Sequence, residues 1–226
     1  MKLILFDIDS TLLRDGGAAQ GAFNQAFVEQ FGTTPGYIDK YGKTDLNIAQ
    51  ETARVTLNRD FSQEEFRLLH ERYCELYPPY LTQSSEFRLC PGVMELCRNL
   101  YSDRSCILGI QTGNFEVQAK AKLEKAALTP FFRFGGYGSD CPDRAELIKI
   151  TIDRGMQVAG RNVPKSAIFV IGDSVHDVRA GKNNGVFSIG VTTGANSEEE
   201  LFAAGADAVV KDLTEESGIF KIISRK

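Results

Sequence analysis

The feature that most constrains the fold is a series of short, almost continuous apolar runs separated by helical segments. The runs are KLILF, CILGI, AIFVIG, VFSIGV and DAVV, and FFRF near Phe132 indicates a further strand. Strands that are covered by helices on both faces of a parallel sheet have this composition. The alternation therefore predicts an α/β fold with a doubly wound, Rossmann-like parallel sheet.

The interval 16–84 interrupts this alternation with helical patterns alone. The segment SQEEFRLLHERYCELY begins with a capping box formed by Ser62 and Glu65, and we expect its helix to end at Pro78 and Pro79. We therefore predict a helical cap over residues 16–84, inserted after the first strand.

The rest of the chain, residues 1–15 and 85–226, is expected to form the α/β core. The net charge is -4, and the basic residues are scattered, which disfavours a nucleic-acid partner. No stretch approaches the roughly 20 apolar residues of a membrane span, and the N-terminal apolar run ends at Asp7, too early for a secretory signal. We expect a cytoplasmic protein without a membrane partner, whose five cysteines are reduced and mostly buried.

Polar residues follow three of the predicted strands. They are Asp7, Asp9 and Thr11 after the first run; Thr112, Gly113 and Asn114 after CILGI; and Asp173, Ser174 and Asp177 after AIFVIG. In open α/β sheets the ligand binds beyond the carboxyl ends of the strands, so these residues should converge. Carboxylates gathered there need a counter-charge, and a few hard oxygen ligands suit Mg²⁺ with space left for a phosphate group. We predict a magnesium site held by Asp7 and Asp173.

Asp7 and Asp9 can then divide the chemistry of phosphoryl transfer. A carboxylate near Mg²⁺ attacks phosphorus, and the other protonates the leaving oxygen and later activates water. Their spacing places both side chains on one side only if the strand conformation continues as far as Asp9. Thr11 and Ser174 are candidate supporting residues, and the hydroxyls and amides of the DST and TGN turns are candidate phosphate donors.

DIDST after the first strand, Thr112 after the second and GDSVHD after a later one resemble the motifs of the haloacid dehalogenase-like hydrolase superfamily. The resemblance covers almost the whole chain and is nearest to the phosphoglycolate phosphatase and β-phosphoglucomutase-like branch, which has a small helical cap. It implies a Mg²⁺-dependent phosphatase for a small phosphorylated metabolite. Asp7 would be the nucleophile, Asp9 the acid and base, Asp173 and the Asp9 backbone carbonyl metal ligands, and Asp177 their support. The carboxylate at Asp9 disfavours dehalogenation.

Two positions depart from the pattern of this branch. Ser10 stands where glycine is usual, and the usual lysine before the metal-binding strand is missing. We predict that Arg144, at the start of a helix, binds the phosphate instead, because arginine can contact a phosphate in bidentate fashion. Lys149 lies about 140° further round that helix, and Lys165 lies at the opposite end of the sheet.

Several interpretations remain open at this stage. Thr112 and Asn114 could cap the following helix, and Thr44 or Asp45 could cap the helix after YGKT. The resemblance instead places Lys43 and Thr44 in a loop for substrate specificity. His176, inside GDSVHD, is expected to be a surface residue.

Alternative functions also remain. A phosphomutase of the same fold would hold the phosphoryl group on Asp7 until a sugar phosphate rebinds. A signalling receiver domain also uses acids and Mg²⁺, but it needs no cap and carries its acceptor on another strand. A catalytically inactive relative is a further alternative. The sequence is compatible with a monomer or a homodimer.

Overall fold

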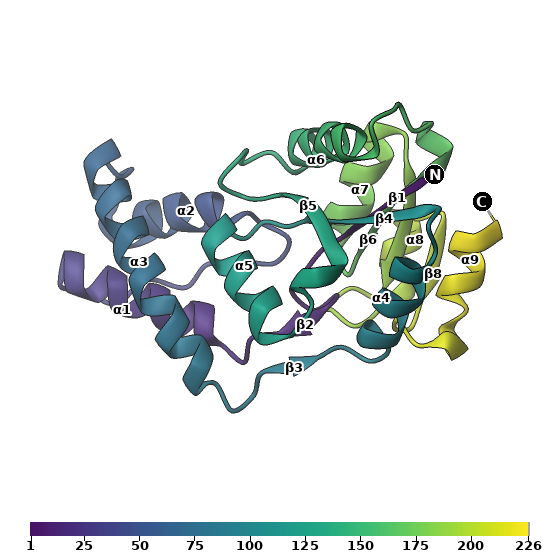
Figure 1. Ribbon diagram of the computed structural model, residues 1–226. Coiled ribbons are helices and arrows are strands. Elements are labelled where there is room, and N and C mark those ends of the chain that lie inside the picture. The colour runs from purple at the N-terminus through teal and green to yellow at the C-terminus, as the bar shows by residue number, and fades with distance from the viewer. Residues whose placement is uncertain (226) are drawn as a thin grey trace.

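A computed structural model describes residues 1–225, and it confirms the α/β fold (Figure 1). The main sheet has six parallel strands in the order β5-β4-β1-β6-β7-β8. The strands are β1 (Lys2–Phe6), β4 (Cys106–Gln111), β5 (Phe132–Gly136), β6 (Ile168–Gly172), β7 (Phe187–Val191) and β8 (Ala208–Val210). Each coincides with a predicted apolar run. The central position of β1 places the residue after it, Asp7, between the ends of β4 and β6.

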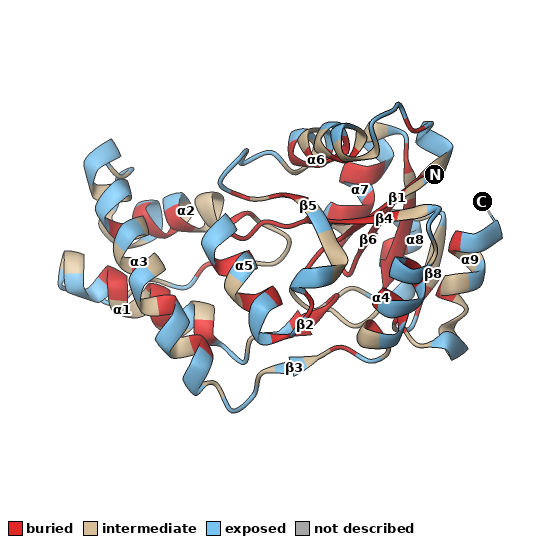
Figure 2. Ribbon diagram, in the orientation of Figure 1, coloured by how far each residue is buried: buried red, intermediate tan, exposed pale blue. Residues whose placement is uncertain are grey.

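Helices cover both faces of the sheet, which explains why β1 is apolar from Leu3 to Phe6. Leu3 and Leu5 pack toward α6 (Arg144–Ala159) and α7 (Val175–Asn184), whereas Ile4 and Phe6 pack toward the other face. That face is covered by α4 (Val93–Ser102), α5 (Glu116–Lys125) and α9 (Ile219–Arg225). Helix α8 (Glu198–Ala203) and short 3₁₀ turns at Thr129–Phe131, Lys165–Ala167 and Glu215–Ser217 complete these elements. The strands are buried and the outer helix faces exposed, which gives a three-layer core (Figure 2).

The predicted helical segment forms a separate group of helices beyond the end toward which β1 runs (Figure 1). It consists of α1 (Ala18–Phe31), α2 (Asp45–Leu57) and α3 (Gln63–Gln83). Phe27 of α1 and Tyr77 of α3 belong to an apolar cluster distinct from those on the two sheet faces. This segment therefore has its own core, to which the α/β part contributes Phe115.

Helix α3 differs from the prediction at its C-terminal end. It runs through Pro78 and Pro79 to Gln83, so the predicted end at the prolines is wrong. Each proline removes one backbone donor, a local cost, but Tyr77 and Leu81 are buried against the other helices of this segment and keep the helix in place. Packing outweighs the local preference.

The chain enters and leaves the helical segment through a two-stranded antiparallel ribbon. Strand β2 (Leu13–Arg14) pairs with β3 (Arg88–Leu89). Beyond the ribbon the Ser84 hydroxyl donates to the Asp15 carbonyl at 2.8 Å. The two connections to the helical segment thus lie side by side.

No helix among residues 1–225 is long and apolar enough to cross a membrane. The five cysteines are free thiols, but only Cys90 and Cys97 are buried, so the prediction that most of them are buried is wrong.

Candidate active site

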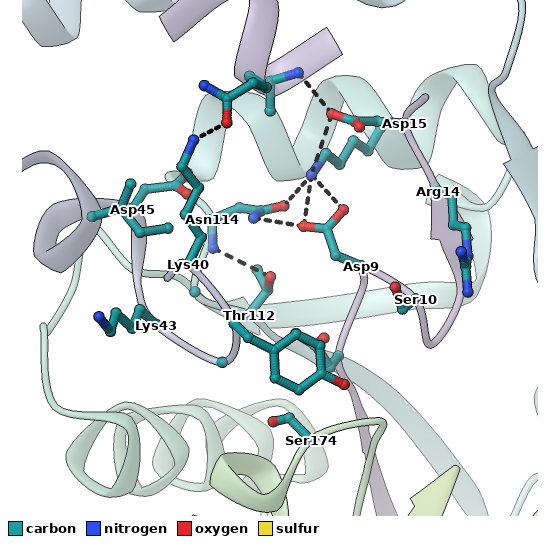
Figure 3. Close-up of a pocket in the computed structure, with 18 of the residues that line it drawn as sticks. Asp9, Ser10, Arg14, Asp15, Lys40, Lys43, Asp45, Thr112, Asn114 and Ser174 are labelled. Atoms are coloured by element: carbon teal, nitrogen blue, oxygen red, sulfur yellow. Dashed lines mark hydrogen bonds and ion pairs between the residues drawn. The ribbon is translucent and has the colours of Figure 1, made fainter. Parts of the chain in front are cut away.

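A cavity of about 550 Å³ lies between the ends of β1, β4 and β6 and the helical segment (Figure 3). Most of the predicted site residues line it: Asp7, Asp9, Lys43, Thr112, Gly113, Asn114, Arg144, Asp173, Ser174 and Asp177. Thr11 and Thr44 are buried nearby but are not among its lining residues. Strands far apart in the sequence therefore bring the predicted chemistry to one place.

The first group of side chains, which we call the Asp7 cluster, consists of Asp7, Arg144, Asp173 and Asp177. Arg144 Nη2 donates to Asp7 Oδ1 at 2.9 Å and to Asp177 Oδ1 at 2.5 Å. Asp143 caps α6 by accepting from the amides of Ala145 and Glu146, and this fixes the start of the helix that carries Arg144. The guanidinium thus lies between two buried carboxylates, at the start of α6.

The charges of the Asp7 cluster are unbalanced, with three carboxylates around one guanidinium. Burial and the charge of Asp177 raise the pKa of Asp7 well above its usual value. Burial and the same neighbour raise the pKa of Asp173 to about 6. Burial opposes ionisation of Asp177 too, but Arg144 and hydrogen bonds outweigh it and lower the pKa of Asp177. Excess negative charge of this kind favours a bound cation.

One oxygen from each of Asp7, Asp173 and Asp177 can lie within 4.8 Å of the others, as a metal site requires. Asp177, however, is occupied by protein donors: Arg144 and Gln111 bind Oδ1, and the Ser174 hydroxyl binds Oδ2 at 2.5 Å. Asp7 and Asp173 therefore keep oxygens that could bind a divalent metal ion, whereas the oxygens of Asp177 are engaged by protein donors.

Asp173 is held from the core and from the helical segment. Thr11 Oγ1 donates to Asp173 Oδ1 at 3.1 Å, and the Tyr41 hydroxyl donates to Oδ2 at 2.6 Å. The same hydroxyl accepts from the Ala195 amide at 2.8 Å. Tyr41 lies in the loop between α1 and α2. This contact could not be predicted from the sequence, because a loop tyrosine has many possible neighbours.

The turn after β1 separates the carboxylates of Asp7 and Asp9, which lie two positions apart in the sequence. The strand ends at Phe6, and Ser10 adopts φ 59, in the left-handed region that favours glycine. This conformation gives a physical reason why glycine is usual at this position in the phosphoglycolate phosphatase and β-phosphoglucomutase-like branch. Asp7 consequently faces Arg144, whereas Asp9 faces a different cation.

The second group, the Asp9 cluster, consists of Asp9, Asp15, Asn114 and Lys122. Figure 3 labels the first three of these residues. Lys122 Nζ donates to both carboxylate oxygens of Asp9 at 2.7 Å and to Asn114 Oδ1 at 2.8 Å. Asn114 Nδ2 donates to Asp9 Oδ2 at 2.8 Å. Sequence analysis missed Lys122, because a lysine inside the α5 sequence AKAKLEK resembles its exposed neighbours.

The Thr112–Asn114 turn contacts the helical segment directly. The Asp45 amide donates to the Gly113 carbonyl at 2.7 Å, and Asp45 Oδ2 accepts from the Phe115 amide at 2.9 Å. A side chain at Gly113 would clash with the Lys43 carbonyl, since its Cβ would lie 2.6 Å away. An acid of the helical segment, Asp45, thus binds the N-terminus of α5, and capping of α5 by Thr112 or Asn114 is not observed.

Three remaining candidates lie near the same loop. Thr44 caps α2 by accepting from the Asn47 amide. Lys43 lines the cavity and pairs with Glu51 at 2.5 Å. His176 is exposed, as predicted, beside Gly42 of this loop.

A doubly wound sheet with carboxylates beyond the ends of its central strands defines an α/β enzyme of the Rossmann-like class. The chain belongs to the haloacid dehalogenase-like hydrolase family, whose model matches residues 4–191. The family predicted from the sequence motifs is thereby confirmed.

Related proteins match nearly the full chain. A phosphoglycolate phosphatase from Agrobacterium fabrum is 30% identical over 220 residues, covering 93% of this chain and 88% of that protein. Another, from Synechococcus elongatus, is 30% identical over 212 residues, covering 92% and 91%. A solved structure described as a predicted phosphoglycolate phosphatase, from Haemophilus somnus, has a TM-score of 0.73 at 20% identity and covers 98% of this chain and 97% of that one. A provisional β-phosphoglucomutase from Bacteroides vulgatus has a TM-score of 0.73 at 18% identity, covering 100% and 89%. The two structures show likeness of fold.

Proposed function

We propose that this protein is a Mg²⁺-dependent phosphatase that hydrolyses a phosphomonoester of a small metabolite through an aspartyl-phosphate on Asp7. The observation that carries the proposal is the Asp7 carboxylate, which lies beside Arg144 at the end of the central strand, in a cavity that also holds Asp9. The family, and relatives named phosphoglycolate phosphatase, support a phosphate ester as the substrate.

In the proposed reaction, an oxygen of Asp7 attacks phosphorus while the bond from phosphorus to the ester oxygen breaks. Asp9 gives a proton to that leaving oxygen. Asp9 then takes a proton from water, whose oxygen attacks phosphorus and releases the Asp7 carboxylate. Arg144 binds the phosphoryl oxygens, with help from the Thr112–Asn114 turn.

Asp7, Asp173 and the backbone carbonyl of Asp9 are the proposed ligands of Mg²⁺. The ion supplies positive charge beside the phosphoryl oxygens when it is bound. Asp177 orients Arg144, and Thr11 and Tyr41 hold Asp173 in position.

Residues 16–84 are proposed to act as a cap over a core of residues 1–15 and 85–226. Closure would exclude water from the cavity and place Lys43 near the substrate. The proposed setting is the cytoplasm, with a monomer or homodimer and without a nucleic-acid or membrane partner.

The test is phosphate release from p-nitrophenyl phosphate and a panel of small phosphomonoesters that includes 2-phosphoglycolate. We expect release with Mg²⁺, none with EDTA, and loss of both turnover and trapped phosphoenzyme in Asp7→Asn. Asp60→Asn, on the exposed cap surface, is the matched control. Turnover by Asp7→Asn would show that Asp7 is not the nucleophile.

Asp9→Asn should retain Mg²⁺ binding and slow both chemical steps, and an unchanged rate would remove the acid and base role. Isomerisation of a sugar phosphate that depends on a bisphosphate, without net phosphate release, would instead identify a phosphomutase.

A further inference from the structure

Lys122 is a buried lysine that the proposed reaction has not used. It is 1% exposed, whereas Lys120 and Lys125 of the same helix are exposed. Its amine is 2.7 Å from each oxygen of Asp9, 2.8 Å from Asn114 Oδ1 and 3.9 Å from Asp15 Oδ2. A buried ammonium group is costly unless acceptors surround it, so its position is closely determined.

The side chains of Lys122, Asn114 and Asp9 each contact the other two and so form a triangle. Lys122 binds Asp9 and Asn114, and Asn114 Nδ2 binds Asp9 at 2.8 Å. Burial alone would lower the pKa of Lys122, but Asp9 and Asp15 outweigh it and raise that pKa, so the amine remains charged.

Both residues that hold the Asp9 carboxylate, Lys122 and Asn114, belong to the α/β part of the chain. The Asp9 side chain remains 44% exposed, and it lines the cavity. Its carboxylate is therefore anchored through α5 and still accessible to a substrate oxygen. A general acid must lie within hydrogen-bond reach of the leaving oxygen, and small displacements of such groups are costly.

We propose that Lys122 is a positioning residue that, together with Asn114, orients Asp9 toward the leaving oxygen of the substrate. The proposal rests on the proposed function, because it requires Asp9 to transfer a proton. Lys122 acts through Asp9 and needs no contact with the transferred phosphoryl group.

The test compares two leaving groups in Lys122→Met. The p-nitrophenolate ion leaves readily without a proton, whereas an alkoxide, as in glycerol phosphate, needs one. We expect kcat/KM to fall by roughly 10²–10³ for the alkyl ester and by less than about tenfold for p-nitrophenyl phosphate. Lys120→Met, on the exposed face of α5, should change neither value.

Asn114→Ala removes one side of the triangle without leaving a cation unpaired, and it should give a smaller loss with the same preference. Asn114→Ala also tests the proposal if Lys122→Met does not fold. Equal losses for both esters would mean that the triangle is only structural, and would overturn the proposal.

Two controls separate this proposal from the proposed function. If Asp9→Asn shows the leaving-group preference and Lys122→Met does not, the inference about Lys122 fails alone. If Asp7→Asn remains active, or Asp9→Asn shows no preference, the proposed function fails first.

Discussion

The Asp7 and Asp9 clusters share one cavity, and each places carboxylates around a single buried cation, but they differ in which oxygens remain available. In the Asp9 cluster, Asp9 is bound by Lys122 and Asn114, and Asp15 accepts from the amides of Gly17 and Ala19. In the Asp7 cluster, the Asp177 carboxylate accepts hydrogen bonds from Arg144, Gln111 and Ser174. Asp7 and Asp173 have fewer protein donors and keep free acceptor positions.

The number of acids alone therefore does not define a metal site. A metal site also needs free oxygen lone pairs and uncompensated negative charge, because a hard cation binds only acceptors that the protein leaves unused. Among residues 1–225, Asp7, Asp173 and Asp177 form the acidic group close enough to share an ion. We therefore expect changes in the Asp7 cluster to alter metal binding and changes in the Asp9 cluster to leave it intact.

The largest expected effect comes from Arg144→Met. It leaves Asp7 and Asp177 without their cation and removes a phosphate donor, so we expect kcat to fall about 10³-fold. The free energy of unfolding without metal should fall by about 3 kcal/mol or more, measured by urea denaturation. Mg²⁺ should recover part of this loss.

Arg144→Lys is the matched control and should retain more stability, since the charge remains. If Mg²⁺ stabilised Lys122→Met as much as Arg144→Met, this would contradict the expectation that changes in the Asp9 cluster leave metal binding intact.

A smaller effect is expected from Tyr41→Phe, which removes the cap's hydrogen bond to Asp173. A hydrogen bond to a charged group is worth about 1.5–3 kcal/mol, so kcat/KM should fall roughly tenfold or more. Amide hydrogen exchange in the loop between α1 and α2 should quicken, as the loop loses its contact with the core. Tyr37→Phe, which changes a tyrosine that is 91% exposed in the same loop, is the control and should change neither measurement.

The smallest effect concerns pH. A carboxyl whose folded-state pKa is raised is destabilised when it ionises, so stability without metal should fall as the pH rises from about 4 through 6. Mg²⁺ needs the ionised forms of Asp7 and Asp173, so its Kd, measured by calorimetry, should rise by about fourfold or more between pH 7.5 and 5.5.

Asp45 also has a pKa raised to about 6 by burial, so Asp45→Asn should be included to separate the two groups. A Kd for Mg²⁺ that did not change with pH would exclude a proton on Asp173 in the metal-free protein.

The sequence was sufficient to predict the sheet and most of the residues of the Asp7 cluster. Parallel strands align their carboxyl ends, so Asp7, Thr112 and Asp173 had to meet once the strands were recognised. Arg144 could be predicted because the start of α6 also faces this edge.

The Asp9 cluster and the cap contacts could not be predicted in the same way. Lys122 is buried only because α5 packs beside the turn that carries Asp9, and Tyr41 reaches Asp173 only through the placement of a loop. Neither position differs from an ordinary helix or loop residue in the sequence. The continuation of α3 through Pro78 likewise depends on packing that no local pattern records.

The ribbon of β2 and β3 has a consequence for how such a protein can diversify. Because the chain leaves and rejoins the core at adjacent points, the entropic cost of closing the inserted segment is met locally and grows only slowly with its length. Segments of very different size could be exchanged at this junction without shifting a strand of the sheet, so the sheet with its carboxylates and the inserted segment could change independently.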